Sequence, residues 1–193
     1  MNNAERIMTK QTNPSAEVVL QQWLQREADI RQTLLPHRIL PVHEVLPLSG
    51  LQLIQGMLNG HTPPATISKT LDFLLVEVRA GKAVFQGQPG AAHLNPMGTV
   101  HGGWFSTLLD SALGCAVHTM MPPGRAYTTA GLNVNMVKAL TPKVSRVRAE
   151  AEVVHCGKQL ATAQARLVGA DGTLYAHATS TCLVFDIPTQ LKP

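Results

Sequence analysis

Charged residues are scarce in this sequence: Lys, Arg, Asp and Glu make up 15% of its 193 residues, whereas a typical domain has about 25%. Apolar residues reach 45%. That fraction excludes a disordered chain, because such chains combine low hydrophobicity with high net charge. Since so few charges remain for the surface, we expect part of it to be covered by sister subunits.

Runs of Lys and Arg are also missing, although the net charge is +4 and the pI is about 9.2. A nucleic-acid interface needs basic residues gathered in one run or on one face. The sequence therefore predicts no nucleic-acid partner, and its mildly basic character suits an anionic small molecule.

Cysteines and long apolar runs are few as well. Cys115, Cys156 and Cys182 are odd in number and lack CxxC spacing, so neither a disulfide framework nor a zinc site follows, and a cytoplasmic location is expected.

No apolar segment follows the first six residues, so no signal peptide is expected. Residues 102–121 carry little charge but include Asp110 and several hydroxyl groups. This composition favours a buried helix over a membrane span.

The pattern of apolar residues changes near residue 65. Before that point, helical spacing predicts a helix over residues 15–35, capped by Ser15, and a shorter helix that starts at Ser49. We therefore expect residues 1–65 to be a helical extension, residues 66–187 the main domain and residues 188–193 a C-terminal tail.

After residue 71 the apolar period becomes two, which predicts strands. Short links between successive strands imply antiparallel pairing, and a single helix against such a sheet is an α+β layout. Because that helix is apolar on nearly all sides, we expect a curved sheet to wrap around it. The expected elements are a hairpin of residues 74–79 and 82–88, a helix over residues 103–120, and strands over residues 128–137, 144–155, 159–168 and 174–185.

Two glycines mark the start of the long helix. Amides at a helix N-terminus have no partner inside the helix and attract negative charge, and glycine allows a ligand to approach the backbone closely. Gly102 and Gly103 could therefore stabilise an oxyanion. The alternative is that they only form a turn.

Three further residues near this point could carry chemistry. Asp110 is the only charged residue between Gly102 and Met121, and burial of an unpaired carboxylate is costly. It is a candidate nucleophile or general base, or a carboxylate that reaches a helix N-terminus or a surface gap. Asn95 could donate to a leaving group or a water, or form a turn before Pro96. His101 could be an acid or base, or a structural residue that fixes the loop.

The spacing along the helix has a geometric consequence. Gly103 and Asp110 are seven residues apart, which is roughly 10 Å along a helix axis. A carbonyl held at the helix start lies beyond the roughly 3 Å that direct attack by Asp110 requires. If both act on one substrate, the Asp must come from a second copy, so the spacing predicts a symmetric dimer with two sites.

The pattern Asn95-x-x-Gly98-x-x-His101-Gly102-Gly103, with Asp110 nine residues after the His, resembles the hotdog-fold acyl-CoA thioesterases, most closely the PaaI-like (phenylacetate-degradation-type) branch. The resemblance covers about residues 67–185. It implies a sheet wrapped around a central helix, and pairing into dimers and often tetramers. It also implies hydrolysis of an acyl-CoA or aryl-CoA thioester without a metal, with CoA present only as part of the substrate.

The resemblance also implies roles for single residues. Asp110 matches the nucleophile or general base, and Gly102 matches the amide that polarises the thioester carbonyl. Asn95 matches the residue near the sulfur or the attacking water, and His101 matches the residue that supports the loop. A Ser or Thr across the site corresponds to Thr129, or to Thr128 because the loop is about one residue longer here.

Substrate contacts are expected at Gly103, Lys138, Gly157 and Lys158, the two lysines because the phosphates of CoA attract cations. Lys158 is the best single candidate, since the family often has a basic residue there. Lys143, Arg146 and Arg148 lie on or beside the same strands. Each of these cations could equally be an ordinary solvated residue.

The sequence alone also allows other interpretations. Trp104 and Phe105 could shape an acyl pocket or pack in the core or a dimer interface. The first 65 residues exceed what the family core needs, and they could cap the acyl pocket, add subunit contacts, or do neither. The chain could also be an acyl-CoA-binding sensor or scaffold, or a hydratase or dehydratase of the same fold.

Overall fold

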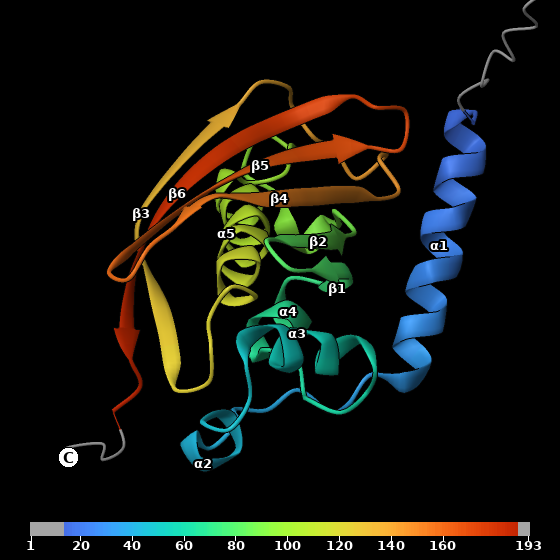
Figure 1. The fold of residues 1–193 in the computed structure, drawn as a ribbon. Helices are drawn as coiled ribbons and strands as arrows, with labels where there is room; N and C mark the ends of the chain where they lie inside the picture. The colour runs from blue at the N-terminus through green and yellow to red at the C-terminus, as the bar shows by residue number, and fades with distance from the viewer. Residues whose placement is uncertain (1–13, 189–193) are drawn as a thin grey trace, which may run out of the picture.

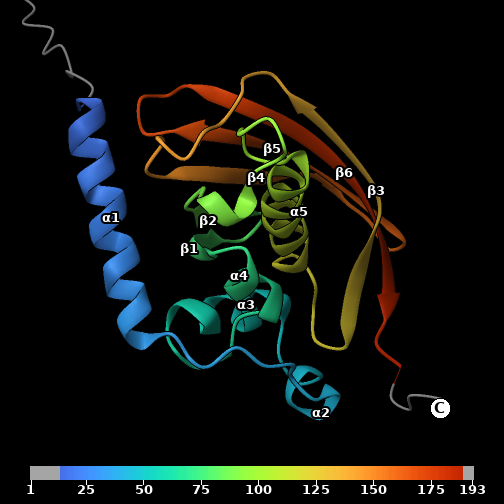
Figure 2. The ribbon, with the colours of Figure 1, turned by 180° about the vertical axis from the view of Figure 1, so that it is seen from behind.

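A six-stranded antiparallel sheet arches over one long helix in the computed structural model, which describes residues 14–188 (Figures 1 and 2). The central helix is α5 (Gly102–His118). The strands are β1 (Phe73–Arg79), β2 (Lys82–Gly87), β3 (Arg125–Met136), β4 (Val147–Cys156), β5 (Leu160–Gly169) and β6 (Leu174–Asp186), in the spatial order β1-β2-β4-β5-β6-β3. The expected α+β layout of a sheet wrapped around a helix is confirmed. Nearly all of the expected C-terminal tail lies outside the described residues, as do residues 1–13.

One strand pairing differs from the expectation that successive strands are neighbours. β3 pairs with β6 and not with β4. The link between β3 and β4, residues 137–146, is long enough to cross to another part of the sheet. It is anchored by fully buried Leu140, whose carbonyl accepts a hydrogen bond from the Val100 amide at 2.9 Å. β3 is consequently an edge strand with one free side.

The core lies between α5 and the concave face of the sheet. Small residues on that face let the helix approach closely, and large apolar side chains of α5 fill the remaining space. Trp104 and Phe105 are 3% and 2% exposed, and the Trp104 indole N–H donates to the Leu71 carbonyl at 2.9 Å. Both aromatic residues therefore belong to the core. The fully or almost fully buried alanines of the sheet are Ala83, Ala149, Ala151, Ala161, Ala163, Ala165, Ala176 and Ala178.

Within residues 14–72, four helices precede the sheet: α1 (Ala16–Thr33), α2 (Val42–Val45), α3 (Gly50–Leu58) and α4 (Thr66–Thr70). Ser15 caps α1, and Ser49 caps α3 in a reciprocal arrangement with Gln52, so both expected helices are confirmed. α2 and α4 were not expected, because four and five residues are too few to show helical periodicity. A 3₁₀ turn, Ala91–His93, precedes α5.

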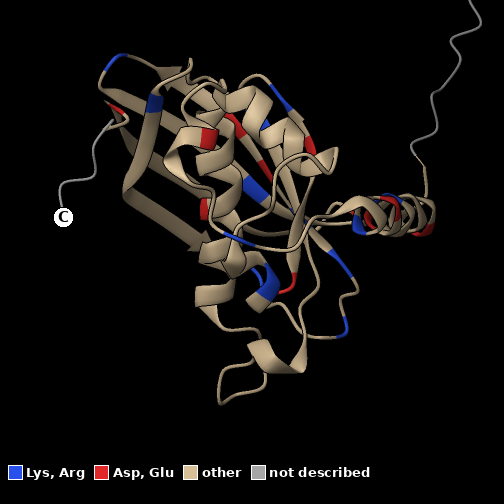
Figure 3. Cartoon of the chain, turned by 90° about the horizontal axis from the view of Figure 1, so that it is seen from below, with Lys and Arg blue, Asp and Glu red and all other residues tan. Residues whose placement is uncertain are grey.

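Helix α1 packs on the outer face of the sheet beside β1, β2 and β4. Its Ile30 contacts Leu74 and Val76, and its Glu27 is 5% exposed among polar partners. Charged side chains are otherwise dispersed, with both signs present on α1 (Figure 3).

Helix α3 docks against the C-terminal end of α5. The Gly50 amide donates to the Met121 carbonyl at 2.9 Å. A Cβ at Gly50 would lie 1.7 Å from the His118 carbonyl oxygen, so only glycine permits this approach. The extension is thus fixed to the core at α3.

None of the helices within residues 14–188 is both long and apolar enough to cross a bilayer.

Candidate active site

Asn95 organises the loop that leads into α5. Its side-chain oxygen accepts from the amides of Met97 and Thr99 at 2.9 and 3.2 Å. Its side-chain nitrogen donates to the Thr99 hydroxyl at 2.8 Å. Gly98 completes the turn with φ +82°, a conformation that favours glycine. In this chain Asn95 therefore shapes the loop, and its second N–H is the one left for another partner.

His101 caps helix α5, and its ring binds the amide of Gly103 but not that of Gly102. Its Nδ1 accepts from the Gly103 amide at 2.8 Å, so a neutral ring carries its proton on Nε2. Gly103 is consequently occupied inside the protomer. The Gly102 amide has no hydrogen-bond acceptor among residues 14–188. The helix start thus presents one free donor, at the place where the helix dipole favours negative charge.

Asp110 lies half-buried on α5 and is held from the neighbouring strand. The Thr129 hydroxyl of β3 donates to Asp110 Oδ1 at 3.0 Å. Thr128 is exposed and lines an open hollow of about 410 Å³ together with Asp110 and Thr129, but the hydrogen bond to Asp110 comes from Thr129. Of the two threonines considered from the sequence, Thr129 is the one that the structure brings to Asp110. An irregularity in the β3–β6 register lies between Thr129 and Gly131, in the region where the sequence left the choice between the two threonines open.

Gly102 and Asp110 are on the same helix, eight residues apart, which is roughly 12 Å along the axis. Within one protomer these two groups cannot contact the same carbonyl. Two copies of α5 in antiparallel contact would bring each Asp110 toward the other copy's Gly102. The free edge of β3 lies beside Asp110 and is available for such a contact.

A cavity of about 210 Å³ opens next to Asp110. Its wall is mostly apolar and includes Phe73 and Phe85, whose rings meet edge to face at 5.9 Å. Cys115 also lines it, but burial raises the pKa of this thiol to about 12. A thiol with that pKa stays protonated near neutral pH and is a poor nucleophile, whereas the Asp110 carboxylate also lines this cavity.

Tyr127 of β3 forms one side of the cavity. Its ring lies over Gly114, where a Cβ would be 2.2 Å from the tyrosine hydroxyl oxygen. Burial raises the pKa of Tyr127 well above its ordinary value, so the phenol stays protonated. Tyr127 also packs edge to face on His118, and burial lowers the pKa of that histidine. The sequence pattern did not point to Tyr127, and the feature of the sequence that relates to it is Gly114, where a side chain would collide with the tyrosine ring.

Two of the expected cations are unavailable to CoA. Arg146 pairs with Glu27 at 2.6 Å, and Arg148 lies 4.4 Å over the Trp23 ring while it binds Gln86 and Glu77. For these two arginines the suggested CoA contact is wrong, because helix α1 covers them.

Lys138 and Lys158 lie at opposite ends of β3 in one protomer. Lys138 follows β3 and sits 5.8 Å over the Tyr175 ring. Lys158 follows Gly157 in the β4–β5 turn, where its carbonyl accepts from Arg125 at the start of β3. Since roughly 40 Å of strand separates these ends, one CoA cannot use both lysines of one copy. Lys143 is exposed in the link before β4.

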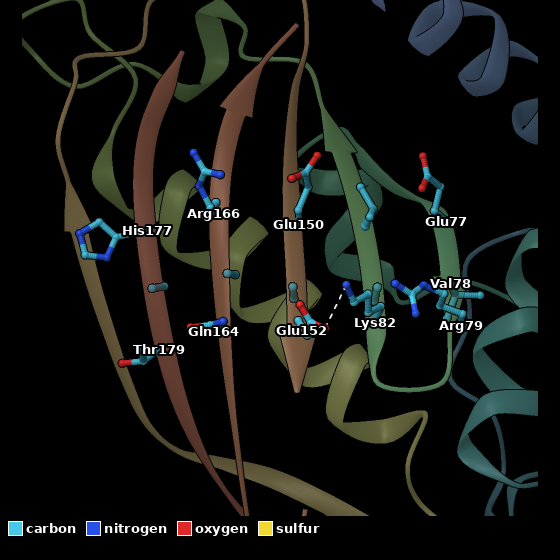
Figure 4. A pocket seen from close by; sticks show the side chains of 15 residues that line it. Glu77, Val78, Arg79, Lys82, Glu150, Glu152, Gln164, Arg166, His177 and Thr179 are labelled. Carbon is cyan, nitrogen blue, oxygen red and sulfur yellow. Dashed lines mark ion pairs between the residues drawn. The ribbon is translucent and has the colours of Figure 1, made fainter. Parts of the chain in front are cut away.

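Another hollow, of about 560 Å³, lies on the outer face of the sheet, with α5 behind it (Figure 4). Side chains of both charges line it, and Lys82 pairs with Glu152 there at 3.0 Å. It contains none of the residues of the Asn95 to Asp110 segment, so it is separate from the candidate site. Within residues 14–188, His, Cys, Asp and Glu side chains form no group of three or more suited to a metal ion.

Part of the chain matches a known protein family. Residues 97–176 match the profile of the thioesterase superfamily. Those residues form a thioesterase-superfamily domain. The class of enzyme is therefore thioester hydrolase.

Solved structures agree with this assignment. The phenylacetic acid degradation-related protein of Ralstonia eutropha is 27% identical, with a TM-score of 0.62 over 68% of this chain and 98% of that one. A thioesterase family protein of Silicibacter pomeroyi is 27% identical, with a TM-score of 0.58 over 63% and 90%. A point mutant of the phenylacetic acid degradation protein PaaI of Thermus thermophilus is 28% identical, with a TM-score of 0.55 over 61% and 96%. No curated protein matches the chain. The resemblance to PaaI-like thioesterases is confirmed.

Proposed function

We propose that the protein is an acyl-CoA thioesterase that acts as a homodimer with two sites. Each site combines the free Gly102 amide of one protomer with Asp110 of the other. The observation that carries this proposal is the separation of the two groups along α5, since neither group alone can both polarise and attack a thioester carbonyl.

The proposed reaction uses residues of both copies. The Asp110 carboxylate attacks the thioester carbonyl carbon, or removes a proton from a water that attacks it. Negative charge develops on the carbonyl oxygen, where the Gly102 N–H and the helix dipole stabilise it. The carbon–sulfur bond then breaks, and CoA leaves as the thiolate. In the nucleophilic route, water hydrolyses the resulting anhydride and returns the carboxylate of Asp110.

Other residues have supporting roles in this proposal. The Thr129 hydroxyl orients Asp110, His101 fixes the helix start, and Asn95 holds the loop while its remaining N–H faces the sulfur or a water. Lys158, with Arg125 beside it, is the candidate contact for CoA phosphates. Cys115, Cys156 and Cys182 are free thiols, which is consistent with the reducing cytoplasm that we propose as the location.

Release of free thiol from a panel of acyl-CoAs tests the function, with Asp110→Asn as the matched variant. The isosteric amide keeps the shape but supplies neither a nucleophilic carboxylate nor a base. We expect turnover to fall by at least roughly 10²-fold, with the fold unchanged by circular dichroism. Binding of acyl-CoA without thiol release by the wild type would instead support a sensor or scaffold. Hydration of an enoyl-CoA would support a hydratase.

A further inference from the structure

We propose that residues 34–68 close the acyl pocket of this enzyme and set the size of the acyl group it accepts, with Met57 of α3 as the main specificity-determining residue. This inference rests on the proposed thioesterase function. The cavity beside Asp110 has fifteen lining residues, and seven of them come from residues 34–68. Residues 34–68 therefore supply almost half of the residues around the space where an acyl group next to Asp110 would extend.

Helix α3, which carries Met57, is held in place by close contacts at both of its ends. α3 is held at its start by the Gly50 contact with the end of α5. At its other end, a Cβ at Gly56 would lie 2.7 Å from the Thr62 hydroxyl oxygen, and that hydroxyl donates to the Leu53 carbonyl at 2.8 Å. Met57 itself is partly buried and packs against the main core. A side chain fixed in this way can limit the length of a ligand.

The cavity is also suited to an uncharged group. Apart from Asp110 at its edge, the ionisable side chains in its lining are Cys115, Tyr127 and His37. The first two stay protonated, as described above. Burial, together with Lys69 and Arg31, lowers the pKa of His37, which keeps the imidazole neutral at physiological pH.

The volume indicates the class of acyl group. A cavity of about 150 Å³ lined by apolar side chains binds benzene. By proportion, the 210 Å³ found here holds roughly eight carbons. The geometry points to medium-chain acyl groups, or to single-ring groups of similar size, and against long-chain fatty acyl groups.

Reciprocal variants at one position test this inference, with kcat/KM measured across saturated acyl-CoAs from four to sixteen carbons. Met57→Ala shortens a side chain of the cavity wall, so we expect the acyl-chain length with the highest kcat/KM to increase. For chains just above the wild-type limit, kcat/KM should rise roughly tenfold. Met57→Phe enlarges the side chain and should move the optimum to shorter chains. Met120→Ala is the control, because Met120 is exposed in the segment that follows α5 and does not line the cavity.

Ile67→Ala provides a second variant that is safe for folding, since Ile67 lines the cavity but is 47% exposed. We expect a shift in the same direction as for Met57→Ala. Thiol release with an unchanged chain-length profile in both Met57 variants and in Ile67→Ala would overturn this inference and leave the thioesterase function intact. Absence of thiol release from every acyl-CoA by the wild type would overturn the proposed function itself.

Discussion

The Thr129 hydroxyl donates a hydrogen bond to Asp110 Oδ1 at 3.0 Å, and this contact joins the edge strand β3 to the central helix α5. A carboxylate held by one donor keeps its second oxygen free. That oxygen is the one available to a substrate or a water.

Replacement of Thr129 by valine removes this donor and keeps the shape of the side chain. A hydrogen bond to a charged group is worth about 1.5–3 kcal/mol. We expect kcat to fall by roughly 10- to 150-fold, with little change in KM if the bond serves to orient Asp110. Thr129→Ser keeps the hydroxyl and should retain most of the activity. Equal rates for the Val and Ser variants would show that the hydroxyl has no role.

The free amide of Gly102 can be removed without breaking the helix. Proline is tolerated at the first helical position, and His101 before it has φ −64° and ψ 138°, which a residue before proline readily adopts. Gly102→Pro should lower kcat by roughly 10²–10³-fold, the usual cost of losing an oxyanion donor.

Gly102→Ala is the matched control for that variant. Its Cβ would lie 2.8 Å from Met136 Cε, the same crowding that proline introduces, but it keeps the N–H. Because the Met136 side chain is flexible, we expect the alanine variant to stay within about tenfold of the wild type. Similar losses in both variants would assign the effect to crowding.

The buried carboxylate of Glu27 holds helix α1 against the sheet. Burial opposes its charge, but hydrogen bonds from Arg146, Gln86 and Arg31 outweigh that effect and hold the pKa of Glu27 below its ordinary value. Glu27→Gln leaves Arg146 without its carboxylate partner, while Arg31 keeps Asp72, and it should lower the free energy of unfolding by roughly 2–4 kcal/mol at neutral pH. Glu17→Gln, an exposed carboxyl of the same helix, should change it by less than about 1 kcal/mol.

The pH dependence of this difference has a definite sign. A depressed pKa stabilises the fold above the ordinary pKa of the group, and the stabilisation is lost as the pH falls through the folded-state pKa. The difference in unfolding free energy between wild type and Glu27→Gln should be constant above about pH 5 and shrink below it. Denaturant titrations at several pH values measure it, and a difference that grows with acid would contradict this role of Glu27.

The junction between α3 and α5 has no room for a side chain at Gly50. Gly50→Ala places a Cβ 1.7 Å from the backbone oxygen of His118, so α3 must move. We expect a loss of about 1–3 kcal/mol, and also a broader acyl-chain profile, because α3 carries Met57. Gly90→Ala is the control, since its Cβ would meet its nearest neighbour atom only at 3.8 Å, and it should be nearly neutral. An unchanged melting temperature in Gly50→Ala would contradict the tight junction.

Much of the fold could be predicted because its signals are local. The β1–β2 hairpin surrounds Ala80-Gly81, and Gly81 has φ +72°, as a tight turn requires. Helix α5 begins at paired glycines and ends just before Pro122 and Pro123. The pairing of β3 with β6 could not be found in this way, since it depends on a link that crosses the sheet.

In the candidate site, too, the local features could be predicted from the sequence and the contacts between distant segments could not. The spacing from Asn95 to Asp110 lies in one continuous segment, so the sequence could identify it. The sequestration of Arg146 by Glu27 joins residues 119 positions apart, and alternation along β4 gave no sign that a helix covers its polar face. The cavity wall also combines segments far apart in the chain, so the contribution of Met57 appears only in the fold.

Hybrid dimers test the central claim, catalysis across two protomers, most directly. Neither Gly102→Pro nor Asp110→Asn should be active alone. When the two variants are unfolded together and refolded, half of the dimers combine one copy of each, and each such dimer contains one intact site. Shared sites predict recovery of thiol release to roughly a quarter of the wild-type rate. If Gly102 and Asp110 act within one copy, no intact site forms, and a mixture as inactive as its parents would contradict the shared site.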